Sequence, residues 1–241
     1  MRFFTLTQAC LLATGLSTLA NGTPLAPRGE KIGHKDVVGF AEVNTSGPWG
    51  RAFKRFKPYL SVETGCVPFP AVDKDGNWSG GLKKGGTHNG QCSSSTGQVY
   101  VRGKKYGDQY AIMYSWYMPK DNPSPAVGHR HDWEAAVVWV DDINKSSPKM
   151  TALSTSEHGK YGKTTSWKSD GTRPYIAYAQ LGTHQLAPGG SKGGEQPMIP
   201  WEAMTQAARD ALNGDNWGSD AVVPFKDADD NFNKNLGKAE P

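Results

Sequence analysis

Four short runs rich in aromatic and β-branched residues constrain the fold of this chain most strongly. Asp108–Met118 and Trp133–Val140 contain no Gly or Pro, and Lys149–Ser156 and Pro174–Gln180 follow them, each bounded by turn residues. Such runs predict strands, and strands at this spacing favour a β-sandwich. The composition agrees, because 29 Gly and 8 Trp suit a β protein with many loops.

Three further segments predict helices around this β structure. Pro48–Tyr59 carries aromatic residues at helical spacing, and its helix is expected to begin near the first proline. Pro200–Leu212 is typical of a good helix, and Asp227–Ala239 of a weaker terminal one. We therefore predict one domain over residues 34–241, mainly β, with a β-sandwich flanked by about three helices.

The first 20 residues predict a secretory signal peptide. Arg2 gives a basic start, Ala9–Leu19 is apolar or small, and Ala20 completes a small-residue cleavage site. A membrane anchor is the alternative, but the apolar run is far shorter than the roughly 20 residues that span a bilayer. Residues 21–33 are predicted to be a flexible leader, and we expect a secreted, extracellular protein.

The cysteines agree with secretion. Cys10 lies in the predicted signal peptide, so the mature chain keeps Cys66 and Cys92. Two thiols in an oxidising compartment most simply form one disulfide, which would contribute about 3–4 kcal/mol by restricting the unfolded chain. A metal site is the alternative, although the pair lacks the CxxC spacing of zinc sites. Possible glycan sites are the sequons that begin at Asn21, Asn44, Asn77 and Asn144.

The densest group of ionisable residues is the heptapeptide from Gly128 to Glu134, GHRHDWE, at a predicted loop-to-strand junction. In an extended chain, Asp132 and Glu134 share one face, and two carboxylates on one face repel each other unless a cation or base lies between them. Asp121 can return to the same place because the intervening loop closes back. Three carboxylates with one or two imidazoles favour Mg²⁺, Ca²⁺ or Mn²⁺ over Zn²⁺.

Each member of this group also has a plainer interpretation. The order His-x-His-Asp resembles the start of the metallo-β-lactamase pattern, but Glu134 stands where that pattern needs a histidine, so the match fails. Trp133 is expected in the core rather than at a ligand, and Arg130 is as well suited to bracing a loop. A surface charge cluster without an ion is the alternative for the whole group. The net charge of +4, without a Lys/Arg block, does not indicate nucleic acid.

The stretch Ala111–Glu134 resembles the signature region of the necrosis- and ethylene-inducing-like proteins (NLPs) of fungi, oomycetes and bacteria. GHRHDWE is the hallmark of that family and is complete here, and the likeness extends to Gly65–Val72 and Ser156–Tyr161. A single cysteine pair resembles the type 1 branch. The resemblance implies a β-sandwich flanked by helices, similar to actinoporins and some fungal lectins.

The resemblance also implies a function. It implies a cytolytic virulence factor, not an enzyme, that damages the plasma membranes of eudicot plants. Its expected partner is the headgroup of glycosylinositol phosphorylceramide (GIPC), a plant sphingolipid, bound beside a divalent cation. Plant pattern-recognition receptors are the expected partners of the segment 111–134.

Individual roles follow from the same resemblance. Asp121 and Asp132 resemble direct metal ligands, and His129 and Glu134 resemble groups that reach the ion directly or through water. The headgroup cavity would be lined by His158, His184 and Arg130, although no carboxylate stands beside His184. Trp167 lies in a polar loop and fits either a membrane contact or a packed loop anchor.

Two other functions stay open on the sequence alone. Paired carboxylates can perform acid–base chemistry, so a metal-dependent polysaccharide hydrolase is one alternative. A family member that binds glycan or lipid, or serves as an immune pattern, without killing cells is the other.

Overall fold

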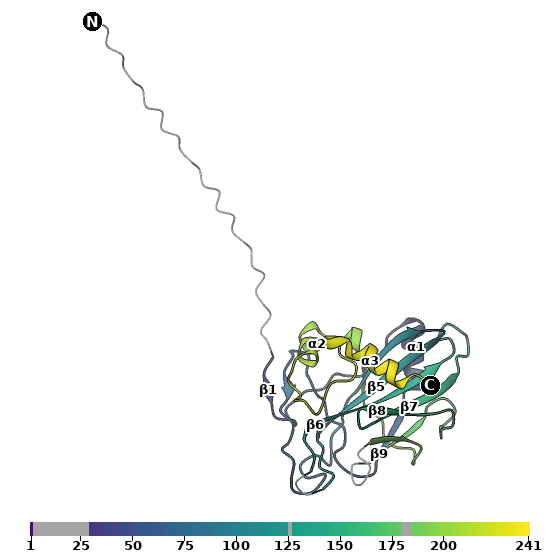
Figure 1. Cartoon of the computed structure of the whole chain (residues 1–241), viewed down its shortest axis with the longest axis horizontal. Helices are drawn as coiled ribbons and strands as arrows, with labels where there is room; N and C mark the ends of the chain where they lie inside the picture. The colour runs from purple at the N-terminus through teal and green to yellow at the C-terminus, as the bar shows by residue number, and fades with distance from the viewer. Residues whose placement is uncertain (2–28, 125–126, 180–184) are drawn as a thin grey trace.

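The computed structural model describes residues 1, 29–124, 127–179 and 185–241. The described chain is mainly β, as predicted (Figure 1). One sheet holds nine of its strands. These strands are β2 (Tyr59–Val62), β4 (Val99–Tyr106), β5 (Gln109–Lys120), β6 (Arg130–Val140), β7 (Met150–Glu157), β8 (Lys160–Thr164), β9 (Tyr175–Ala179), β10 (Gln185–Pro188) and β11 (Met198–Pro200). The four strands predicted from sequence are β5, β6, β7 and β9.

The sheet curls back on itself. Its order is β11-β4-β5-β6-β7-β10-β9-β2, and β8 pairs with β7 beside this path. β7 and β10 stand between β6 and β9 in this order, yet the Tyr178 hydroxyl on β9 donates a hydrogen bond to Asp132 Oδ2 on β6 at 2.8 Å. The part of the sheet that contains β9 therefore folds back over β6 at its centre, which agrees with the predicted sandwich-like fold.

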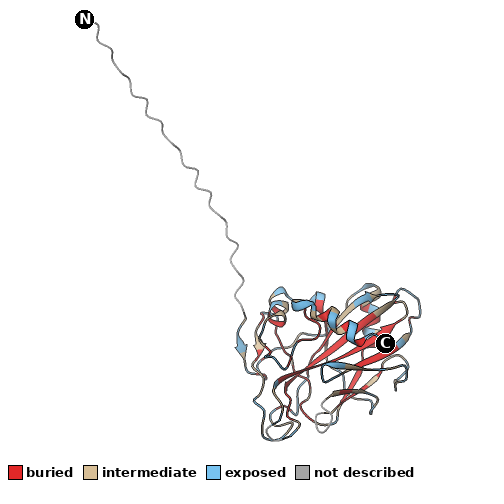
Figure 2. Cartoon of the chain, viewed as in Figure 1, coloured by how far each residue is buried: buried red, intermediate tan, exposed pale blue. Residues whose placement is uncertain are grey.

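β5 and β6 form the centre of the core. They pair antiparallel with Ile112 opposite Val138 and Trp116 opposite Glu134. Ten consecutive residues of each strand are buried. Figure 2 shows these central strands in the colour of buried residues. A strand buried on both faces carries a continuous apolar run instead of alternation, which explains the density of aromatic and branched residues in the sequence.

Helices cover both faces of this centre. The Gly103 Cα approaches the Trp49 ring of α1 (Gly47–Phe56), so closely that a Cβ would lie 2.3 Å from it. The neighbouring Lys104 Nζ instead donates to Asn233 in α3 (Asn231–Ala239). Because adjacent strand residues point to opposite faces, α1 and α3 lie on opposite sides of β4. Within the described chain, no helix is long and apolar enough to cross a bilayer.

The predicted helix over Pro200–Leu212 is wrong in its first half. Pro200 ends β11, a 3-10 turn η1 follows at Trp201–Ala203, and the backbone is extended at Met204 before α2 (Gln206–Asn213) begins. The Thr205 hydroxyl accepts a hydrogen bond from the Ala208 amide at 3.2 Å and so caps α2. A threonine inside this apolar pattern favours a helix start over a helix interior.

The predicted terminal helix over Asp227–Ala239 is also divided. A 3-10 turn η2 (Ala228–Asp230) precedes α3, and Asp229 and Asp230 have φ angles of 58° and 56°. Aspartate tolerates this left-handed conformation better than most residues, so the pair supplies a turn where the periodicity suggested a continuous helix.

The described part of the chain includes residues 29–33, on the N-terminal side of residue 34, where the sequence analysis placed the start of the domain. Lys31 and Ile32 form β1 (Lys31–Ile32), which pairs parallel with β3 (Trp78–Ser79), although the sequence placed them in the leader. Residues 2–28, which include most of the predicted signal peptide and leader, lie outside the described residues. β3 lies between Cys66 and Cys92, which form the predicted disulfide and are fully buried.

Candidate functional site

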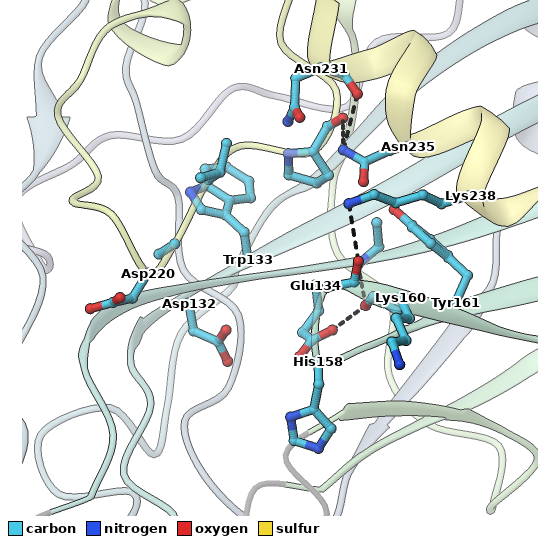
Figure 3. Close-up of a pocket in the computed structure, with 16 residues that line it drawn as sticks. Asp132, Trp133, Glu134, His158, Lys160, Tyr161, Asp220, Asn231, Asn235 and Lys238 are labelled. Carbon is cyan, nitrogen blue, oxygen red and sulfur yellow. Dashed lines mark hydrogen bonds between the residues drawn. The ribbon is translucent and has the colours of Figure 1, made fainter. Parts of the chain in front are cut away.

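A pocket of about 350 Å³ lies where β6 and β7 separate (Figure 3). Their pairing ends at Ala136 and Thr155, and beyond it the Ala135 amide donates to Ser156 Oγ at 2.9 Å. We call this space the carboxylate pocket. It is lined by Asp132, Glu134, Ser156, His158, Lys160 and Tyr161 of the sheet and its turns, and by Asp220, Asn231, Asn235 and Lys238 of the opposite wall.

Three carboxylates are buried at this end of β5 and β6. Asp121, Asp132 and Glu134 are only 2–5% exposed. Asp132 accepts the hydrogen bond from Tyr178, and Glu134 accepts one from the Ser156 hydroxyl. Burial, followed by the negative charges of Asp132 and Asp121, raises the pKa of Glu134 well above its usual range. The neighbouring carboxylates therefore disfavour the ionised form of Glu134.

Gly128 brings Asp121 to the site. The Asp121 amide donates to the His129 carbonyl at 2.9 Å, and the His129 amide returns a bond of 3.1 Å to the Asp121 carbonyl. His129 Nε2 lies 3.7 Å from Asp121 Oδ2. Gly128 has a φ of 103°, and a Cβ there would lie 2.4 Å from the Asp121 carbonyl oxygen. Only glycine fits, so the first residue of the heptapeptide closes the loop.

We expect Gly128→Ala to destabilise the protein by at least about 2 kcal/mol, because it adds left-handed strain to a steric clash. Gly107→Ala is the matched control, since Gly107 also has a positive φ of 56° but no neighbouring group lies within 4 Å of the place that an alanine methyl would take. The control should cost about 1 kcal/mol from strain alone. Urea denaturation measures both, and equal losses would contradict the role assigned to Gly128.

Two other side chains of the heptapeptide, His131 and Trp133, are buried in the interior, although Trp133 also borders the carboxylate pocket. His131 Nδ1 lies 2.7 Å from the Tyr117 hydroxyl, and burial, followed by the positive charges of Arg130, His129 and Lys31, lowers the pKa of His131 to about 4. Trp133 is 8% exposed and belongs to the core, as predicted. In Figure 3 its ring points away from the Asp132 and Glu134 carboxylates.

The other predicted site residues are placed differently. His158 lines the carboxylate pocket from the β7–β8 turn. Arg130 does not line it, because its Nη1 donates to the carbonyls of Gly80 and Gly81 on the far side of β6. Trp167 is partly buried and packs against the core. His184 lies outside the described residues.

The sequence did not indicate several residues of the site. Tyr178 approaches Asp132 only because the sheet curls, and Lys238 lines the pocket only because α3 folds over β7 and β8. Lys120 and Asn122 flank Asp121 and hold the disulfide loop, through bonds from Lys120 Nζ to the Thr87 carbonyl and from the Gly85 amide to Asn122 Oδ1. In the sequence, the one feature that could have drawn attention to Lys120 and Asn122 is that they stand directly beside Asp121, a candidate metal ligand.

Whether these residues can bind a cation depends on the kind of donor atoms that they offer. Among the described residues, no three His, Cys, Asp or Glu side chains are already gathered as a metal site requires. The donors nevertheless suit a hard ion, since Asp121, Asp132 and Glu134 are buried carboxylates and two of them raise the pKa of the third. We therefore judge that the residues fit Mg²⁺ or Ca²⁺ better than Zn²⁺, after small shifts of side chains.

Comparison with known proteins identifies the family. A family model described as necrosis inducing protein (NPP1) matches residues 50–239. The necrosis-inducing protein NPP1 of Phytophthora nicotianae is 43% identical over 216 residues, which cover 86% of this chain and 90% of the relative. The chain belongs to the necrosis-inducing protein (NPP1) family. The resemblance carried by GHRHDWE is thereby confirmed.

Solved structures in the same family share the fold. A structure described as NLPPya in complex with mannosamine has a TM-score of 0.79 and 44% identity, and the match covers 86% of this chain and 98% of that one. A structure described as the non-toxic HaNLP3 protein has a TM-score of 0.79 and 36% identity, over 86% and 99% of the two chains. The NPP1 fold is thus shared by a sugar-bound protein and a non-toxic one.

Proposed function

We propose that this NPP1-family protein is a secreted cytolysin that binds GIPC headgroups through a divalent cation and permeabilises eudicot plasma membranes. The observation that carries the proposal is the position of buried, mutually repelling carboxylates at the wall of the carboxylate pocket. The relative bound to mannosamine supports a sugar ligand. The predicted signal peptide and the buried disulfide support secretion.

The residues that would hold the cation are Asp121, Asp132, His129 and Glu134. A bound Mg²⁺ or Ca²⁺ would supply open coordination positions that sugar hydroxyls can occupy. Tyr178 orients Asp132 and the Ser156 hydroxyl orients Glu134, so these two carboxylates are already directed by neighbours. Asn235 and Lys160 place further polar groups on the pocket wall, within reach of a glycan.

We propose that the carboxylates bind rather than catalyse. A Glu134 with a raised pKa could serve as a general acid, which keeps hydrolysis of a polysaccharide as a specific alternative. Against it, Glu134 is 5% exposed and accepts a hydrogen bond from Ser156, which places it poorly for donating a proton to a glycosidic oxygen. Incubation with pectin and with GIPC should release no product, and product formation lost in Glu134→Gln would favour the hydrolase.

A non-cytotoxic binding protein is the second candidate. The non-toxic relative has the same fold, so the fold alone does not carry toxicity. An immune role would also be independent of toxicity, through receptors for the segment 111–134. Ala111–Met118 is buried in β5, so we propose that receptors meet this segment only after the chain has been unfolded or cut.

Vesicle leakage tests the proposal. Dye-loaded vesicles of phosphatidylcholine, sterol and plant GIPC should leak when the protein and Ca²⁺ or Mg²⁺ are added. Vesicles in which GIPC is replaced by glucosylceramide should leak far less. Binding to GIPC vesicles without leakage would select the non-cytotoxic candidate, and equal leakage from both vesicles would contradict headgroup recognition.

A further inference from the structure

A second cavity, of about 300 Å³, lies next to the carboxylate pocket. Lys31 of β1, His129 and Arg130 at the start of β6, and Trp217 of the loop before α3 line it. We call it the basic cavity. Asp220 lines both spaces, so they adjoin each other. The proposed cation site does not by itself explain what the basic cavity binds.

The charges of the basic cavity differ from those of its neighbour. Lys31 and Arg130 are exposed, and neither forms an ion pair with the described residues. Asp220, also exposed, is the one carboxylate among the lining residues. His129 adds an imidazole that lies 3.7 Å from Asp121, between the two spaces. The cavity therefore offers an excess of positive charge to a ligand.

Two donors in the basic cavity are held in place by the fold. Arg130 Nη1 is fixed by the carbonyls of Gly80 and Gly81, and no described residue accepts from its Nε or Nη2. Trp217 is 3% exposed, and its buried Nε1 finds no acceptor among the described residues. A guanidinium whose orientation is set and whose other N–H groups are available matches the tetrahedral oxygens of a phosphate group.

We infer that the basic cavity binds a phosphate ester of the same ligand whose sugar is held in the carboxylate pocket. This inference rests on the proposed function. A headgroup that carries a sugar, an inositol and a phosphodiester has a group suited to each of the two spaces. Its sugar hydroxyls suit the carboxylate pocket, and its negatively charged phosphodiester suits the basic cavity. Arg130 then binds the ligand from the basic cavity, which adjoins the carboxylate pocket, and Lys31 and Trp217 line the same cavity.

Calorimetry with small probes tests this assignment. In Ca²⁺ buffer, the mature protein should bind glycerophosphoinositol at least about tenfold more tightly than free inositol, because charge-assisted hydrogen bonds act only on the phosphodiester. Arg130→Gln and Lys31→Met should each weaken glycerophosphoinositol about tenfold, while the affinity for mannosamine stays within about twofold of the parent. Arg130→Lys keeps the charge and should lose less than Arg130→Gln.

The control is Lys149→Met. Lys149 is exposed beside Val140, at the opposite end of β6 from Arg130, so its loss changes the net charge equally without touching the cavity. Because Arg130 also braces Gly80 and Gly81, Lys31→Met keeps the test valid if Arg130→Gln unfolds.

The outcomes separate this inference from the proposed function. Equal affinity for glycerophosphoinositol and inositol would overturn the inference, as would a loss in Lys149→Met as large as that in Lys31→Met. Inorganic phosphate that binds as tightly as glycerophosphoinositol would support an anion site but assign it to free phosphate. Absent mannosamine binding in the parent would instead count against the proposed function.

Discussion

We expect Asp132→Asn to abolish membrane lysis while the fold persists. The substitution keeps the shape of the side chain and an oxygen that can accept the Tyr178 hydrogen bond, but it removes one of three buried carboxylates. Cation affinity should fall by at least about a hundredfold, because loss of partners that only support ligands already costs about 10–100-fold. Calorimetry with Ca²⁺ and leakage from GIPC vesicles measure the two losses.

The matched control for this substitution is Asp108→Asn. Asp108 is an exposed carboxylate in the turn between β4 and β5, at the opposite end of β5 from Asp121. Asp108→Asn changes the net charge of the protein by the same amount as Asp132→Asn, and it should leave cation binding and lysis unchanged. If Asp132→Asn retained the cation affinity and lytic activity of the parent, the carboxylates would not be the cation site.

Glu134→Gln should have opposite effects on stability and on activity. Burial and the charges of Asp132 and Asp121 raise the pKa of Glu134 above its value in the unfolded chain. The folded, metal-free protein therefore binds more protons than the unfolded chain, and its stability falls as the pH rises from the unfolded pKa towards the folded one. A neutral glutamine removes this fall and can still accept the Ser156 hydrogen bond.

In a chelator at about pH 8, Glu134→Gln should thus be more stable than the parent by about 1–3 kcal/mol. That corresponds to a rise in Tm of about 2–4 °C per kcal/mol for a domain of this size. At about pH 4, below the pKa of about 4.3 that a glutamate has in the unfolded chain, the two proteins should differ little. With Ca²⁺ the order should reverse, because only the parent gains stability from the ion.

Scanning calorimetry of both proteins, with chelator and with Ca²⁺, gives the comparison directly. A Glu134→Gln variant that is less stable than the parent in chelator at about pH 8 would show that Glu134 has a structural partner that compensates its charge. A variant that still gains the full stabilisation from Ca²⁺ would show that the ion binds elsewhere.

The sequence predicts the centre of the molecule well, because the relevant signals are local. The apolar runs that became β5 and β6 are continuous since both faces are buried, and the alternation along β6 places Asp132 and Trp133 on opposite faces. The return of Asp121 to His129 also follows from a short loop, and Gly128 supplies the backbone conformation that the closure needs.

The rest of the architecture depends on contacts between distant segments. β4 contains Gly103, and glycine is unfavourable inside a strand. The Trp49 ring nevertheless packs so close to Gly103 that no side chain fits at this position. The break at Thr205 depends on a cap that periodicity alone does not reveal. Tyr178 and α3 reach the site through the curl of the sheet, and no pattern near them in the sequence points to Asp132 or to the carboxylate pocket.

The central claim is that a divalent cation at Asp121, Asp132 and Glu134 is required for recognition of the lipid headgroup. Its most direct test is leakage from GIPC vesicles before a chelator is added, in its presence, and after excess Ca²⁺ or Mg²⁺ is restored. The account predicts that the chelator stops leakage and that the restored cation revives it. Leakage that continues unchanged in the chelator would contradict the claim.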